Sequence, residues 1–175
     1  MSTKTMQSPT TADEAAIRSI PFQMIDAWNK GDGEAFAAPF AEDADFIAFE
    51  GTHLKGRQEI AAFHQQLFDT AVSRSHLDGK IEFVRFLNPQ LALMHAVDTT
   101  RLSGHRITFP SRDSMQIFVV AKHDGEWFVE GLLNARQLII ERQLLLDDLD
   151  ALPIEDQRTI FDLVESFKQR HLTER

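Results

Sequence analysis

Apolar residues recur at helical spacing in two segments of the N-terminal half of the chain. Residues 11–30 are predicted to form the first helix, because Thr11 followed by Glu14 fits a capping box. Pro21 lies inside this segment and lacks a backbone donor, so we expect a kink or a helix restart there. A later helix is predicted from about residue 57. The apolar sides are Ile17, Ile20, Met24, Ile25 and Trp28 in the first, and Ile60, Phe63, His64, Leu67 and Phe68 in the second.

Strand patterns dominate the middle of the chain. Runs that alternate between apolar and polar residues and are rich in Phe, Ile and Val predict strands. Asp124-Gly125, between the last two runs, is typical of a hairpin turn. Helices followed by an antiparallel meander indicate an α+β fold, in which a curved sheet wraps around helices. The predicted strands cover residues 45–50, 80–87, 90–102, 112–122 and 126–136.

Composition divides the chain into three parts. Residues 1–10 are polar and rich in Ser and Thr, so we expect a disordered tail. Residues 11–136 make up the α+β domain. Residues 137–175 carry two apolar stripes, which predict an appended C-terminal helical hairpin. This hairpin either covers exposed surface within its own subunit or a dimer, or recruits a separate protein partner.

Charge and residue usage argue against several kinds of function. A net charge of −9 with scattered basic residues argues against nucleic-acid binding. The absence of Cys and Tyr excludes thiolate and phenol chemistry. No apolar run reaches the length of a membrane span, and the N-terminus lacks the apolar core of a signal peptide, so we expect a cytoplasmic protein without membrane contact. Neither a metal-ligand spacing nor a nucleotide-binding motif occurs, so we expect no metal and no cofactor.

Three stretches carry a resemblance to a known superfamily. They are AWNKGDGEAFAAPFAEDADFIAFEGTHLKGRQEIAAFH, VRFLNPQLALMHA and HDGEWFVEGLLNAR. Together they resemble the nuclear transport factor 2-like superfamily, and within it the SnoaL-like proteins of the SgcJ/EcaC group, over about residues 13–136. The resemblance implies a cystatin-like cone with a pocket between the N-terminal helices and the concave face of the sheet. It also implies a homodimer, for which we expect the outer sheet face, the C-terminal helices or both to supply the contacts.

The same resemblance argues against steroid isomerisation. The general-base aspartate of the ketosteroid isomerases falls at Ala48, and their oxyanion-donating tyrosine falls at Met24. Without a carboxylate to take the proton or a phenol to hold the enolate oxygen, that mechanism lacks both of its parts. The fold hosts many functions, so the resemblance alone does not assign one.

The pocket that the resemblance implies, combined with strand alternation, predicts an apolar and aromatic lining with few polar groups. For the strand at 112–122, alternation leaves two choices. Either Arg112, Ser114 and Gln116 face inward, or Asp113, Met115 and Ile117 do. The predicted ligand contacts are Met24, Trp28, Phe46, Ala48, Phe63, Met94, Leu132 and Asn134.

Three residues are candidates for proton transfer. His64 lies on the apolar side of its helix, and histidine titrates near neutral pH. The alternative is a histidine at the edge of the core, hydrogen-bonded to a neighbour. Asp98 and Glu130 suit the role of acid or base if an apolar pocket raises their pKa. The alternative for both is a position in solvent, or a pairing with Arg101 or Arg136.

Three functions follow from these observations. The first is the binding of a small, mostly apolar organic molecule, with cofactor-independent proton transfer of the isomerase, dehydratase or cyclase type. The second is a non-catalytic binding or oligomeric assembly module. The third is a catalytic role that requires a partner protein.

Overall fold

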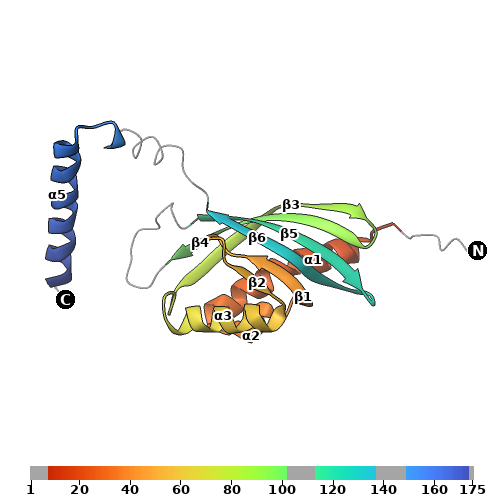
Figure 1. Ribbon diagram of the computed structural model, residues 1–175. Coiled ribbons are helices and arrows are strands. Elements are labelled where there is room, and N and C mark those ends of the chain that lie inside the picture. The colour runs from red at the N-terminus through yellow and green to blue at the C-terminus, as the bar shows by residue number, and fades with distance from the viewer. Residues whose placement is uncertain (1–7, 102–112, 137–148, 174–175) are drawn as a thin grey trace, which may run out of the picture. The chain divides into compact units, whose positions relative to one another are not determined.

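The computed structural model describes residues 8–101, 113–136 and 149–173 (Figure 1). The chain forms two compact units, residues 1–137 and 138–175. The expected tail up to residue 7, residues 137–148 of the expected hairpin and Arg112 lie outside the described residues. In chain order the elements are α1 (Thr11–Lys30), α2 (Gly33–Ala37), β1 (Phe40–Ile47), β2 (His53–Lys55), α3 (Arg57–Asp69), β3 (His76–Asn88), β4 (Leu91–Arg101), β5 (Asp113–His123), β6 (Glu126–Arg136) and α5 (Ile154–Thr173).

Six strands form one sheet in the order β2-β1-β6-β5-β4-β3. All neighbouring strands are antiparallel except β1 and β6, which run parallel. Helices α1, α2 and α3 lie on one side of the curved sheet (Figure 1). This arrangement confirms the predicted α+β class, with N-terminal helices packed on a curved, mostly antiparallel sheet.

Helix α1 covers the predicted residues, but its N-cap lies one residue earlier than the sequence predicts. Thr10, not Thr11, is the N-cap residue, and Asp13 takes the place expected for Glu14 in the capping box. The Thr10 backbone N–H donates to Asp13 Oδ2 over 2.9 Å, and the Asp13 N–H donates to Thr10 Oγ1 over 3.2 Å. The helix does not restart at Pro21. Pro21 is buried, and the packing of the whole apolar side offsets the one lost hydrogen bond.

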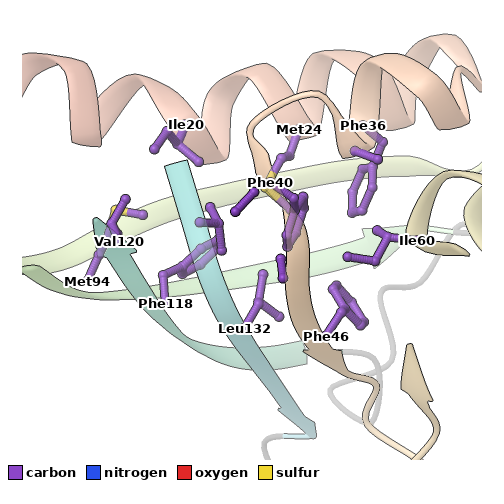
Figure 2. Packing of buried hydrophobic residues seen from close by; sticks show 14 of the residues in the cluster. Ile20, Met24, Phe36, Phe40, Phe46, Ile60, Met94, Phe118, Val120 and Leu132 are labelled. Atoms are coloured by element: carbon purple, nitrogen blue, oxygen red, sulfur yellow. The ribbon is translucent and has the colours of Figure 1, made fainter. Parts of the chain in front are cut away.

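The core lies between α1, α2, α3 and the concave face of the sheet (Figure 2). Its largest side chains with under 2% exposure are Phe40, Phe118, Ile17, Ile60, Met94, Val120 and Val129. Dense apolar packing of this kind supplies most of the stability of a domain.

A polar cluster connects the start of α1 to the residues beside the turn of the β5–β6 hairpin. Lys122 Nζ lies 2.6 Å from Asp13 Oδ1, and Trp127 Nε1 donates to the same oxygen over 3.0 Å. The hydrogen bond from Lys122, followed by that from the Thr10 backbone, holds the pKa of Asp13 well below its usual range. The carboxylate is therefore charged and fully bonded at neutral pH.

Strand β6 contains a β-bulge that changes which residues face the helices. Val120 pairs with Val129 and Val119 pairs with Gly131, so Glu130 is the extra residue. Val129 is therefore on the inner side before the bulge, and Leu132 is on the inner side after it.

Helix α5 belongs to the C-terminal unit. It covers Ile154–Thr173, where the sequence predicts the second helix of the hairpin. Ile154 and Phe161 are largely exposed within the described residues. None of the described helices is long and apolar enough to cross a membrane.

Candidate functional site

A cavity of about 330 Å³ opens between the helices and the concave face of the sheet. One part of its wall is apolar and aromatic, and comes from the helices, β1 and the start of β3. The other part is polar and comes from the C-terminal half of β4, the start of β5 and the end of β6. The apolar part includes Trp28, Phe46, Phe63, Leu67, Val72 and Leu77, and the polar part includes Asp98, Thr100, Ser114, Gln116, Asn134 and Arg136. Glu50, which follows β1, also lines the cavity.

The end of α1 is fixed to the start of β3 by side chains beside the cavity. Trp28 Nε1 donates to Ser75 Oγ over 2.9 Å. The Asn29 amide forms two hydrogen bonds with the Leu77 backbone, one donated over 3.0 Å and one accepted over 2.7 Å. These contacts hold the Trp28 indole in place as part of the cavity wall.

Helix α3, which carries His64, is held close to α2 because Gly33 has no side chain. A Cβ at Gly33 would lie 2.5 Å from Ala61 O and 2.8 Å from Gln65 N, which is too close for any other residue. The Gly33 N–H donates to Gln65 Oε1 over 2.9 Å, which adds a bond between the two helices. The position of α3 therefore depends on a backbone contact.

The predicted ligand contacts fall into two groups. Trp28, Phe46, Ala48, Phe63 and Asn134 line the cavity. The others are buried in the packed core, because the apolar pattern of a helix or strand predicts the side that a residue faces but not its depth along the element. These core residues are Met24, Met94 and Leu132.

The open question about the strand at 112–122 is answered by β5. Ser114 and Gln116 line the cavity, whereas Met115 and Ile117 are about 40% exposed on the opposite face. The polar set is therefore the inward one.

Glu130 does not line the cavity, contrary to its predicted inward position. As the extra residue of the β6 bulge, it is out of phase with the inward residues that follow. Its carboxylate pairs with His123, at the hairpin end of β5 and β6. Phe128 also lies outside the cavity lining.

Asp98 is a buried carboxyl in the polar part of the wall. It is 9% exposed and accepts a hydrogen bond from Gln116 Nε2 over 2.6 Å. Burial raises the pKa of Asp98 to about 6, although hydrogen bonding from Ser114 and the charge of Arg136 partly oppose the increase. Its carboxyl group therefore gains and loses a proton close to neutral pH.

His64 lies in the aromatic part of the wall and is 3% exposed. Its ring is stacked on Phe36 at 4.0 Å between centroids, with Phe46 and Phe63 edge-on at 5.1 and 5.5 Å. Nδ1 lies 2.8 Å from the carbonyl oxygen of Ile60. Burial lowers the pKa of His64 to about 4, so the ring is neutral at physiological pH. No hydrogen bond joins it to Asp98 among the described residues.

Several lining residues escaped the sequence reasoning. Phe49 lies under Arg136, with the guanidinium carbon 3.8 Å from the ring centroid. Phe36 comes from the short helix α2, and Thr100 from the end of β4. Continued alternation beyond Asp98 was the available signal for Thr100. Within the described residues, no three His, Asp or Glu side chains gather closely enough to hold a metal ion.

A model of the SnoaL-like domain matches residues 22–129. The chain belongs to the SnoaL-like family. This SnoaL-like protein has no match among curated proteins. It is 61% identical to a domain of unknown function with a cystatin-like fold from Nostoc punctiforme, with a TM-score of 0.85 over 91% of this chain and 99% of that one. The predicted cystatin-like fold is therefore confirmed.

More distant solved structures share the fold of this SnoaL-like protein. A proposed scytalone dehydratase from Novosphingobium aromaticivorans is 18% identical, with a TM-score of 0.58 over 73% of this chain and 85% of that one. A ketosteroid isomerase-like protein from Erwinia carotovora atroseptica is 16% identical, with a TM-score of 0.61 over 74% of this chain and 100% of that one. At these identities the likeness concerns the fold alone. The finer assignment to the SgcJ/EcaC group stays a prediction.

Proposed function

We propose that this SnoaL-like protein binds a small, mostly apolar organic molecule in its cavity and catalyses proton transfer on it without a cofactor. The observation that carries the proposal is Asp98, a buried carboxyl with a raised pKa on the wall of an otherwise largely apolar cavity. Perturbed carboxyl groups in concave apolar sites are typical of general acids and bases.

The polar groups around Asp98 suit a reaction that develops negative charge on oxygen. The Asp98 carboxylate would remove a proton from a carbon next to a carbonyl group. The hydroxyls of Thr100 and Ser114 and the guanidinium of Arg136 line the same part of the wall and supply donors for the resulting enolate oxygen. Isomerisation, dehydration and cyclisation all share this step.

His64 has a different part in this proposal from the one that the sequence predicts. Because burial lowers its pKa to about 4, the ring carries no charge at neutral pH and is a weak base. We therefore assign proton transfer to Asp98, and treat His64 as an uncharged polar contact for the ligand. Glu130, outside the cavity, has no part in the reaction.

The relatives are compatible with this reaction class without identifying a substrate. The proposed scytalone dehydratase and the ketosteroid isomerase-like protein share the fold. The cavity does not fit the steroid isomerase route, because its wall has Ala48 where that mechanism needs a carboxylate.

The test measures hydrogen–deuterium exchange next to the carbonyl of 2-tetralone in D₂O by NMR. We expect the protein to accelerate exchange, with a rate that rises with pH and has its midpoint near 6. Asp98→Asn should lower the enzymatic rate by about 100-fold or more, because it removes the general base. Glu130→Gln, which changes a carboxyl outside the cavity, is the matched control and should leave the rate unchanged. Binding of 2-tetralone without accelerated exchange would favour the non-catalytic binding function instead.

We also propose that two copies associate through the outer face of the sheet. One residue from each of five adjacent strands forms a row across this face, and each pairs in register with the next: Phe83, His95, Ile117, Leu133 and Ile47. The four apolar members are 38–47% exposed, and Nε2 of His95 is buried without a partner among the described residues. Such a contiguous apolar face is typical of a protein–protein contact.

Sedimentation of the full chain tests this association. We expect Ile117→Asp to convert a dimer to a monomer, because it places a charge at the centre of the row. Phe161→Asp, in the largely exposed part of α5, is the matched variant for the C-terminal helices. If Phe161→Asp dissociates the dimer and Ile117→Asp does not, the interface is formed by the C-terminal helices and not by the outer face of the sheet.

A further inference from the structure

We propose that the ligand of this cavity carries a hydroxyl or N–H group and donates a hydrogen bond from it to Nε2 of His64. This inference rests on the proposed function and names the class of molecule that the site accepts.

The hydrogen bond between His64 and Ile60 determines which ring nitrogen carries the proton. Nδ1 lies 2.8 Å from the carbonyl oxygen of Ile60. A carbonyl oxygen can only accept, so Nδ1 must be the protonated nitrogen of the neutral ring. Nε2 then has a lone pair and no hydrogen, which makes it an acceptor only.

The surroundings of His64 keep the ring in this form. Its aromatic neighbours Phe36, Phe46 and Phe63 provide no proton and no negative charge. The charge of Glu50, which lines the same cavity, favours the protonated ring but only partly opposes the effect of burial on its pKa. Phe36, Phe46 and Ile60 all lie at the same end of the core in Figure 2. A second proton on Nε2 would place a positive charge in this apolar environment, which agrees with the lowered pKa of His64.

Only a hydrogen-bond donor can pair with an acceptor of this kind. Nε2 has no hydrogen-bond partner within the part of the chain that the structure describes, whereas His64 itself lines the cavity. A bound molecule that displaces water but offers an alkyl group or a carbonyl oxygen would leave the acceptor unpaired. Once a ligand has displaced water from Nε2, the site therefore discriminates against molecules that lack the complementary donor.

His64 and Asp98 line the same cavity from different elements. His64 comes from α3 and Asp98 from β4, and no hydrogen bond joins them among the described residues. The ligand accordingly has two features: a donor that contacts the aromatic wall, and an acidic C–H group that contacts the polar wall. Hydroxylated or amino-substituted cyclic ketones have both.

A matched pair of probes tests the donor requirement. 2-Naphthol and 2-methylnaphthalene have nearly the same shape, but only the first can donate a hydrogen bond. We expect 2-naphthol to bind about tenfold more tightly in a fluorescence titration at pH 7, which corresponds to one hydrogen bond. The His64→Phe variant keeps an aromatic ring and loses the acceptor, so the two probes should then bind equally. Asp98→Asn should retain the preference, and a loss in that variant would assign recognition of the hydroxyl to Asp98 and overturn the inference.

A second measurement on the unmodified protein avoids any effect of the substitution on folding. In ¹⁵N-labelled protein, the Nε2 signal of His64 should show an unprotonated nitrogen, and it should move upfield when 2-naphthol binds but not when 2-methylnaphthalene binds. Equal affinities and no selective movement would overturn this inference while leaving the proposed function intact. If neither probe binds and 2-tetralone does not exchange, the proposed function fails, and the inference fails with it.

Discussion

Asp13 and Asp98 are two carboxyl groups with nearly equal exposed fractions and opposite electrostatic behaviour. Asp13 is 8% exposed and Asp98 is 9% exposed. Asp13 is bonded to Lys122, Trp127 and the N-cap of α1, which lowers its pKa. Asp98 is bonded to neutral neighbours on the wall of a cavity, and burial raises its pKa to about 6.

The difference shows how one chain uses the same side chain for stability and for chemistry. A buried carboxylate with a cation and several donors is stable as an anion and joins distant elements. A buried carboxyl without an adjacent cation bonded to it takes up a proton near neutral pH, at a cost in stability. We infer that the hydrogen-bond partners of a carboxyl decide whether the effect of burial on its pKa is outweighed, as at Asp13, or prevails, as at Asp98.

Removal of the structural carboxylate should have the largest effect on stability. Asp13→Ala removes the helix cap contact and leaves Lys122 without its anion. We expect the free energy of unfolding to fall by about 3 kcal/mol at pH 7. Urea denaturation followed by circular dichroism measures this loss of stability. A loss no larger than that of an ordinary surface substitution would contradict the structural role of Asp13.

The second prediction uses the pH dependence of stability at Asp98. The pKa of Asp98 is about 6 in the folded protein, whereas the ordinary value for an aspartate is 3.8. The folded state therefore binds the proton more tightly than the unfolded state does. The contribution of Asp98 is therefore most favourable below pH 4, and is lost as the pH rises through 6. The loss amounts to about 3 kcal/mol at most.

Asp98→Asn should remove this dependence. We expect the variant to gain stability relative to the wild-type protein between pH 4 and pH 7, as measured by urea denaturation at each pH. Asp13 contributes with the opposite sign, because its lowered pKa gives stability above the ordinary value that is lost as the pH falls below it. Parallel curves for the wild-type protein and Asp98→Asn would show that Asp98 is not a perturbed group.

The smallest expected effect concerns the cation beside Asp13. Lys122→Met retains much of the side-chain length and removes the charge. We expect the pKa of Asp13 to rise toward its ordinary range and the free energy of unfolding to fall by about 1 kcal/mol. NMR titration of the Asp13 carboxyl carbon measures its pKa, and thermal denaturation measures the change in stability. An unchanged pKa would assign the lowered value to the helix cap alone.

The sequence was sufficient to predict much of the fold and part of the site. Helical spacing identified the side of α3 that carries His64, and strand alternation placed Phe46, Ala48 and Asp98 on the inner face. Both patterns are local, because they depend only on the geometry of one helix or strand. The family resemblance supplied the arrangement of these elements.

The remaining features depend on tertiary structure. Whether Met94 lies in the core or in the cavity depends on where the helices stop covering the sheet, which no strand pattern contains. The bulge that moves Glu130 was signalled only by Gly131 within a strand, since an isolated glycine there is typical of a bulge. The tautomer of His64 depends on its contact with Ile60, and the pattern of apolar residues carries no information about it.

The bulge in β6 gives the cavity one position at which the chain can shorten without a change in its wall. Val129 pairs with Val120 and Gly131 pairs with Val119, on either side of Glu130. Deletion of Glu130 would join Val129 directly to Gly131 in regular alternation, so Asn134 would stay beside Gln116 on the inner face. A three-nucleotide deletion at this codon is therefore expected to keep the polar wall, whereas the same deletion at Leu133 would turn Asn134 outward and make relatives with that shorter strand accept different molecules.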